Sequence, residues 1–104
     1  MLSFSDLKVG RTYIFHGLVG YGRPALVTLV AVGFHADETS PFIAISTDVT
    51  DMSGRPVDMS IYRKDVISDL DELYYHITDI DSSASLEDSV FCFGTIGIAL
   101  LEEL

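Results

Sequence analysis

The stretch from Ala25 to His35 reads ALVTLVAVGFH, and it decides the fold class. Apolar residues occupy both sets of alternate positions, valine recurs through the stretch, and no side chain before the final histidine is ionisable. This pattern predicts a strand whose two faces are both buried. Such a strand needs neighbours on each side, so we expect the rest of the chain to build a sheet around it.

Four further segments have the β-branched and aromatic content of strands. These segments are residues 11–19, 42–50, 57–63 and 73–78. The second and third of them are expected to form a hairpin, because the residues between them have the composition of a turn. Residues 90–101 are harder to assign. Two glycines and the aromatic residues favour a strand, which we expect, although the end of the segment from Ala99 would suit a helix.

Short helical turns are expected at residues 3–7, with Ser3 or Ser5 as the cap, and within residues 64–73 and 85–88. The chain is therefore predicted to be a single, mainly β domain spanning residues 1–104. Its architecture would be a small antiparallel barrel or curled sheet of five or six strands, with one or two short helical turns.

One stretch near the start has a familiar pattern. The sequence Asp6-Leu7-Lys8-Val9-Gly10, followed by an aromatic-rich strand, resembles the opening of many SH3-like small barrels. The resemblance covers five residues and implies a barrel fold. It transfers no binding residue to this chain.

The charge of the chain is concentrated in its C-terminal part. Residues 1–64 hold six acids and all six Lys and Arg, whereas residues 65–104 hold ten acids and no Lys or Arg, which accounts for the net charge of −10. The ten acids are Asp65, Asp69, Asp71, Glu72, Asp79, Asp81, Glu87, Asp88, Glu102 and Glu103. Uncompensated carboxylates repel phosphate and attract basic protein surfaces. We therefore expect a protein partner with a basic surface and no direct binding of nucleic acid.

This asymmetry leads to our first functional hypothesis, a non-enzymatic protein-binding module. It would act as an inhibitor or nucleic-acid mimic that docks on a basic surface of a nucleic-acid-processing protein. Tyrosines beside the acids fit this hypothesis, because tyrosine buries area at interfaces and keeps a hydrogen-bonding tip. The residues predicted to bind the partner are Asp65, Asp69, Asp71, Glu72, Tyr74, Tyr75, Asp79, Asp81, Glu87 and Asp88. The simpler interpretation of the same acids is a solvated surface that keeps the protein soluble.

Two other hypotheses remain open. The apolar share of 48% and the mean hydropathy of +0.35 are high for 104 residues, so a monomer would expose apolar surface. The second hypothesis is that a homo-oligomer, most simply a dimer, covers apolar strand surface at residues 25–34 and 90–101. The other hypothesis is an enzyme, or a small-ligand or metal binder, built on His16, His35 and His76 if the strands bring them together. None of the three has metal-ligand spacing, so we assign no catalytic residue, metal or cofactor.

The remaining motifs point to ordinary structural roles. Cys92 is the single cysteine, and we interpret it as a small apolar residue of the core. Residues 79–81 begin like a calcium-binding loop, but Ala84 and Val90 stand where that loop needs a glycine and an acid. The chain has neither a secretory signal nor an apolar run long enough to span a bilayer, so we expect a soluble, cytoplasmic protein.

Overall fold

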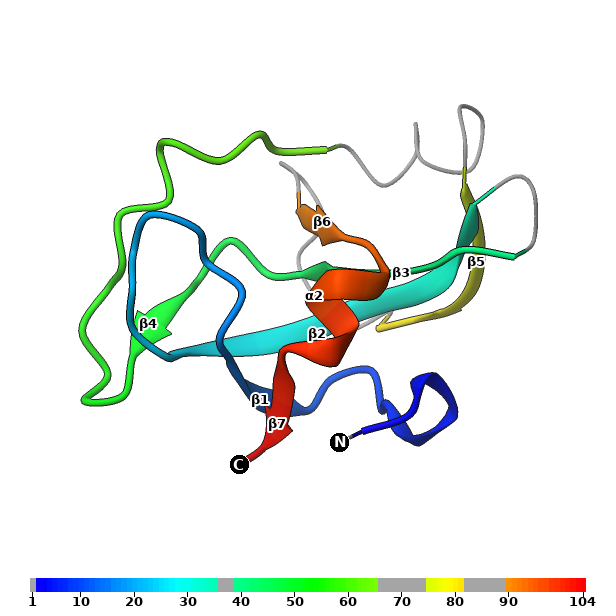
Figure 1. Cartoon of the computed structure of the whole chain (residues 1–104), viewed down its shortest axis with the longest axis horizontal. Coiled ribbons are helices and arrows are strands. Elements are labelled where there is room, and N and C mark those ends of the chain that lie inside the picture. The colour runs from blue at the N-terminus through cyan, green and yellow to red at the C-terminus, as the bar shows by residue number, and fades with distance from the viewer. Residues whose placement is uncertain (1, 36–38, 66–74, 82–89) are drawn as a thin grey trace.

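The computed structural model describes residues 2–35, 39–65, 75–81 and 90–104, and within them the protein is mainly β. Seven antiparallel strands belong to one sheet, accompanied by one 3-10 turn and one short helix (Figure 1). In chain order the elements are η1 (Phe4–Asp6), β1 (Thr12–Phe15), β2 (Ala25–His35), β3 (Pro41–Ile45), β4 (Thr50–Asp51), β5 (Tyr75–Ile80), β6 (Phe91–Phe93), α2 (Thr95–Ala99) and β7 (Leu101–Glu103).

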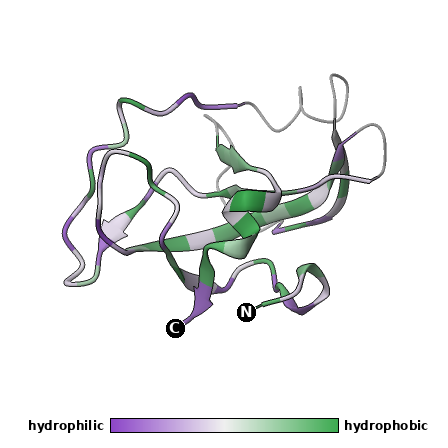
Figure 2. Cartoon of the chain, in the orientation of Figure 1, coloured by the Kyte–Doolittle hydropathy of each residue, from purple (hydrophilic) through white to green (hydrophobic). Residues whose placement is uncertain are grey.

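The long strand β2 is the centre of the sheet, and its bounds are those expected from the sequence. β1 and β4 pair with its first residues, and β3 and β5 pair with its second half. Leu29 and Val32 enter one core cluster, whereas Val30 and Ala31 enter another. The predicted burial on both faces is therefore confirmed for residues 29–33, whereas Leu26 and Thr28 are half-buried, and Figure 2 shows the hydrophobic stretch along this strand.

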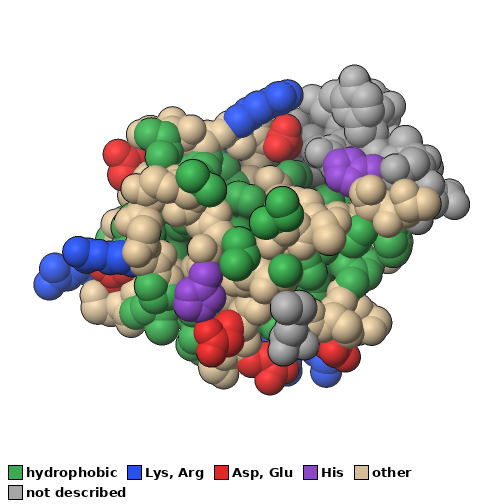
Figure 3. Space-filling view, viewed as in Figure 1, with side chains coloured by type: hydrophobic (Ala, Val, Ile, Leu, Met, Phe, Trp, Pro, Cys, Tyr) green, Lys and Arg blue, Asp and Glu red, His purple; other side chains and the backbone are tan. Residues whose placement is uncertain are grey.

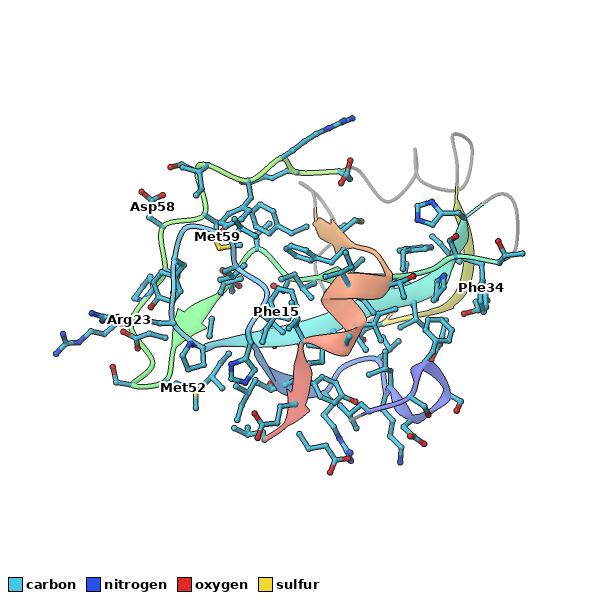
Figure 4. The ribbon with its side chains drawn as sticks, in the orientation of Figure 1. Phe15, Arg23, Phe34, Met52, Asp58 and Met59 are labelled. Carbon is cyan, nitrogen blue, oxygen red and sulfur yellow. The ribbon has the colours of Figure 1, made fainter. Side chains whose placement is uncertain are left out.

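The main core lies between the sheet and α2. Phe15 is fully buried, and its side chain points from β1 into the middle of the molecule (Figure 4). Its ring packs edge-on against Phe93, with 4.8 Å between the ring centroids. A Cβ on Gly97 would lie only 2.5 Å from the Cβ of Phe93, so the helix needs glycine at this position to approach the strand so closely.

The sheet is not closed into a barrel, so the barrel expectation and the SH3-like resemblance are wrong on this point. The strand order β6-β3-β2-β1-β7 leaves β6 and β7 at opposite ends of the path. The described residues also form seven strands rather than five or six. The physical reason lies in residues 90–101, which do not form one strand. Their middle part is α2, and it carries the chain from one end of the sheet to the other.

Residues 57–63 do not form the expected strand, and the predicted hairpin is absent. β3 ends at Ile45, and the short β4 pairs with β2 instead. The Asp51 carboxylate accepts hydrogen bonds from the backbone N–H groups of Ser53 and Arg55, at 2.9 and 3.0 Å. This local turn leaves a single bridge, between Thr50 and Pro56, where we expected a ladder.

The N-terminal helical turn is confirmed as η1, and Ser3 is its cap. Three hydrogen bonds connect Ser3 and Asp6: the Ser3 N–H and hydroxyl both donate to the Asp6 carboxylate, and the Asp6 N–H donates to the Ser3 carbonyl. Phe4 of this turn packs on Phe34 near the end of β2, with 4.9 Å between the ring centroids (Figure 4). The helical turns expected after residue 65 and at residues 85–88 lie outside the described residues.

Candidate groove along the edge strand

An open groove of about 570 Å³ lies between the N-terminal turn and β7. Its lining includes Leu2, Ser5, Asp6, Lys8, Arg11, Leu101, Glu102 and Glu103. A second depression of about 420 Å³ is lined by Arg11, Thr12, Glu103 and Leu104. The two depressions share Arg11 and Glu103, and together we call them the edge groove.

One side of β7 has no paired strand in the described part of the molecule, although Leu101 on that side is only 4% exposed. The His16 N–H donates to the Leu100 carbonyl at 2.9 Å, so residue 100 directs its backbone groups toward the β1 side. Backbone groups alternate in direction along a strand, and Glu102, opposite Ile14, therefore also faces β1. The N–H and C=O groups of Leu101 and Glu103 face the other way, where no described strand pairs with them.

Two of the three carboxylates that line the edge groove are already engaged. The Asp6 carboxylate accepts the Ser3 hydroxyl at 2.6 Å, and these hydrogen bonds with Ser3 lower the pKa of Asp6. The Glu102 carboxylate lies 2.8 Å from Nε2 of His16. The third carboxylate, on Glu103, forms no ion pair with another described residue.

The two cations of the groove have no such partner. The Lys8 backbone N–H donates to the Tyr13 hydroxyl at 2.9 Å, which fixes the backbone of the turn before β1. Among the described residues, no carboxylate lies within 4 Å of the Lys8 ammonium or the Arg11 guanidinium. Because Glu103 is also unpaired and the lining holds three acids and two bases, the groove as a whole is not cationic.

Most residues of the predicted partner-binding set lie outside the described part of the chain. These are Asp69, Asp71, Glu72, Tyr74, Glu87 and Asp88. Tyr75 begins β5, where its backbone pairs with His35 at the end of β2. The structure therefore places three acids of the set, Asp65, Asp79 and Asp81.

These three acids occupy two separate places. Asp79 is exposed on β5, and Asp81 follows the end of the same strand and lies beside Gly10. Asp65 forms a backbone bridge with Val90, next to β6. Because β2 and β3 lie between β5 and β6, Asp65 is at the opposite edge of this part of the sheet from the other two.

The histidine hypothesis requires His16, His35 and His76 to converge, and the backbone does not bring them together. His16 follows Phe15, which pairs with the first residue of β2, whereas His35 is the last residue of β2. Ten residues of strand separate these two ends by about 30 Å. His76 pairs with Phe34, so its backbone is next to His35 and far from His16. Within the described residues, no three His, Cys, Asp or Glu groups are placed to hold a metal ion.

Cys92 has the environment of a core residue. It packs against the cluster that contains Val30 and Val90. Burial, together with the charge of Asp65 and a hydrogen bond to it, raises the pKa of the Cys92 thiol to about 12. The thiol is therefore protonated at neutral pH, which disfavours a nucleophilic role.

Sequence reasoning did not identify the edge groove. Its walls come from the first eleven residues and from the last residues of the chain, and no motif spacing connects segments so far apart. The sequence offered one signal, the two cations Lys8 and Arg11 at the start of the first predicted strand. Neither residue was singled out, because their partners across the groove depend on the pairing of β7 with β1.

Comparison of the chain with models of known protein families, with curated proteins and with solved structures gives no match. Neither of the two helical elements in the described residues is long and apolar enough to cross a bilayer.

Proposed function

We propose that this chain is a non-enzymatic protein-binding module whose acidic C-terminal part docks on a basic surface of another protein. One observation supports the proposal most directly. All six Lys and Arg lie in described residues, and only Arg63 has a carboxylate within 4 Å there, that of Asp65 at 3.7 Å. Arg63 itself is 89% exposed, so this pair is weak. The Lys and Arg of residues 1–64 therefore leave the ten acids of residues 65–104 largely unneutralised.

The charge balance of the described residues adds to this argument. They hold nine of the sixteen acids and all six bases, a net charge of −3, so the other −7 belongs to residues 36–38, 66–74 and 82–89. Arg23 extends away from the surface in Figure 4 rather than toward a carboxylate. A chain that carries such a surplus is suited to a partner rich in Lys and Arg, such as the phosphate-binding face of a nucleic-acid-processing protein.

The test is the capture of partners from the source cell, followed by affinity measurements with the purified partner at rising salt. We expect the partner to have a cationic surface and the affinity to fall steeply by about 0.5 M salt, where the screening length is about 4 Å. An affinity that does not change over this range would refute the electrostatic mechanism.

A matched pair of variants separates a specific acidic surface from overall charge. Asp69→Asn with Asp71→Asn neutralises two acids of the predicted set, and Asp48→Asn with Asp58→Asn neutralises two acids of the first part. Both double variants change the net charge by the same amount. We expect only the first to weaken binding, and equal losses would mean that the partner senses net charge alone.

Self-assembly is the second candidate function. Residues 25–34, which we expected to supply part of its surface, are buried or half-buried in the sheet, and the exposed apolar side chains that favour it lie on other segments. Val19, Ile61 and Ile96 are 83%, 73% and 80% exposed. On the face shown in Figure 3, hydrophobic side chains reach the surface in the middle of the molecule, and most charged side chains lie around its rim. An apolar centre with a charged rim is the usual composition of an interface. Sedimentation of the purified chain decides the question, because a monomer at high concentration would eliminate this candidate.

A further inference from the structure

We propose that two copies of this chain form a two-fold dimer through the face that carries α2, and that they lie antiparallel, so that Lys64 of each copy meets Glu102 of the other. The dimer is the self-assembly candidate above, on which this inference rests, with its face, its orientation and its charged contacts now specified. Three features support it: a strip of exposed apolar side chains, a surplus cation at one end of this strip and a surplus acid at the other end.

A strip of exposed or half-buried apolar side chains crosses the face that carries α2. Its members, which we call the apolar strip, are Val19, Ile61, Tyr62, Phe93, Ile96 and Leu100. The three most exposed large hydrophobic side chains of the described residues, Val19, Ile61 and Ile96, all belong to it. Figure 3 shows such side chains in the middle of this face. Apolar surface that is gathered in this way is typical of an interaction site.

Contacts within the molecule connect the two ends of the apolar strip. The Tyr62 hydroxyl donates to the Val19 carbonyl, and the Tyr62 ring packs edge-on against Phe91 of β6. Phe93, two residues further along β6, lies against Gly97 of α2. The apolar side chains near residue 61 and those of the helix therefore belong to one surface.

The end of the apolar strip near residue 64 has a surplus cation. Arg63 pairs with Asp65 at 3.7 Å, whereas Lys64 is exposed and has no carboxylate within 4 Å among the described residues. Asp58 accepts the N–H of Ser60 at 3.0 Å, and it lies at the left of the view in Figure 4, where this segment begins. Lys64 is therefore the cation at this end that no described acid neutralises.

The opposite end of the apolar strip, at β7, has a surplus acid. The Glu102 carboxylate is 63% exposed, and its partner is the ring of His16 at 2.8 Å. The other charged side chains that line the edge groove are two acids and two bases, which cancel. Figure 1 shows α2 in the middle of the view, with β7 below it and the segment that ends at residue 65 above it. The surplus charges of opposite sign therefore lie on opposite sides of the helix.

This arrangement of charge fits a second copy of the chain and selects its orientation. A two-fold axis that crosses the strip at α2 lays the two strips on each other and brings Lys64 to Glu102 at both ends. An axis along the strip would instead bring Lys64 to Lys64 and Glu102 to Glu102, where like charges repel. The net charge of −10 on each copy opposes any association, so the apolar contact supplies the attraction and the charged ends determine the orientation.

The experiment exchanges the two charges in the complete chain and measures association by sedimentation equilibrium in about 0.15 M salt, where the screening length is about 8 Å. We expect the wild type to dimerise. Lys64→Glu and Glu102→Lys should each weaken the dimer about tenfold, because each places like charges at both ends. An equimolar mixture of the two variants should form a heterodimer with about the affinity of the wild type, because the exchanged charges attract again.

Matched controls separate these contacts from net charge and from general surface effects. Glu102→Lys makes the chain less acidic by two charges, so repulsion between copies alone would strengthen the dimer. Asp79→Lys makes the same change on β5 and should not weaken it. Ile96→Ser should abolish the dimer, whereas Leu104→Ser, at a similarly exposed residue outside the apolar strip, should not.

The outcomes distinguish this dimer from self-assembly in general. A wild type that stays monomeric at high concentration eliminates the self-assembly candidate and this dimer with it. If a dimer forms but Ile96→Ser leaves it intact, or if the mixed variants associate no better than each alone, the chain assembles through another surface and only this arrangement is overturned. A monomer that loses a captured basic partner on Ile96→Ser would assign the apolar strip to that partner, which also overturns the dimer.

Discussion

The hydroxyl of Tyr13 is expected to stabilise the fold through one partly buried hydrogen bond, and Tyr13→Phe tests this. Tyr13 is 1% exposed, and its hydroxyl accepts the backbone N–H of Lys8 at 2.9 Å. The bond connects β1 to the turn that carries Lys8 and Arg11, both of which line the edge groove. The substitution removes the acceptor and leaves the apolar body of the side chain in place.

The magnitude follows from the two groups that the bond joins. A hydrogen bond of this kind contributes about 1 kcal/mol net, and an N–H left without a partner adds part of its desolvation cost. Lys8 is exposed, so water reaches this region and limits the added cost. We therefore expect a loss of about 1–2 kcal/mol in the free energy of unfolding. In a domain of this size that loss lowers Tm by roughly 5–10 °C.

Urea unfolding followed by circular dichroism measures this loss, and the slope against urea should stay unchanged. Tyr62→Phe is the matched control. Its hydroxyl donates to the Val19 carbonyl at the surface, and we expect a change within about 0.5 kcal/mol. If the two variants lose the same stability, or if Tyr13→Phe loses none, the hydrogen bond to Lys8 does not have the role assigned to it.

Three further predictions concern stability. Gly97→Ala should destabilise the fold by about 1–3 kcal/mol in thermal unfolding, because the new Cβ meets another Cβ at 2.5 Å, whereas Gly94→Ala, with open space around it, should not. Burial raises the pKa of the Cys92 thiol to about 12 from an ordinary value of 9.0, so above pH 9 the thiol ionises more readily in the unfolded chain than in the folded one. The free energy of unfolding should therefore fall as the pH rises above 9, and Cys92→Ala should lack this part of the decline. The hydrogen bond from the Ser53 hydroxyl is the main cause of the lowered pKa of Asp51. The ionised Asp51 should therefore stabilise the fold at pH values above 3.8, the ordinary pKa of an aspartate, and this stabilisation should be lost as the pH falls below that value. Asp51→Asn should reduce this acid sensitivity in a pH titration of stability.

The sequence predicts the central strand well, because local and global preferences agree there. Valine, threonine and phenylalanine recur in β2 and favour a strand, and every residue from 29 to 33 is buried, so neither face is exposed there. The same holds for η1, where the reciprocal hydrogen bonds of Ser3 and Asp6 are a short-range signal that does not depend on the rest of the fold.

Residues 57–63 show why other elements could not be predicted. Their composition suits a strand, but the turn made by Asp51 directs the chain away from β3, so no ladder partner is available. Met59 is instead buried in the core, where a side chain from an irregular segment fills the space (Figure 4). A strand requires a partner as well as the right residues, and the partner is determined by long-range contacts.

Residues 94–104 connect the failed barrel prediction with the candidate site. Locally, this segment suits both a strand and a helix, and packing decides between them. Ile98 and Leu101, three residues apart, both enter the core, which α2 followed by β7 permits and a continuous strand with alternating faces does not. After α2 the chain continues as β7, which lies next to β1 and at the other end of the sheet from β6. The segment that fails to form one strand is therefore the segment that places Leu101, Glu102 and Glu103 along the edge groove.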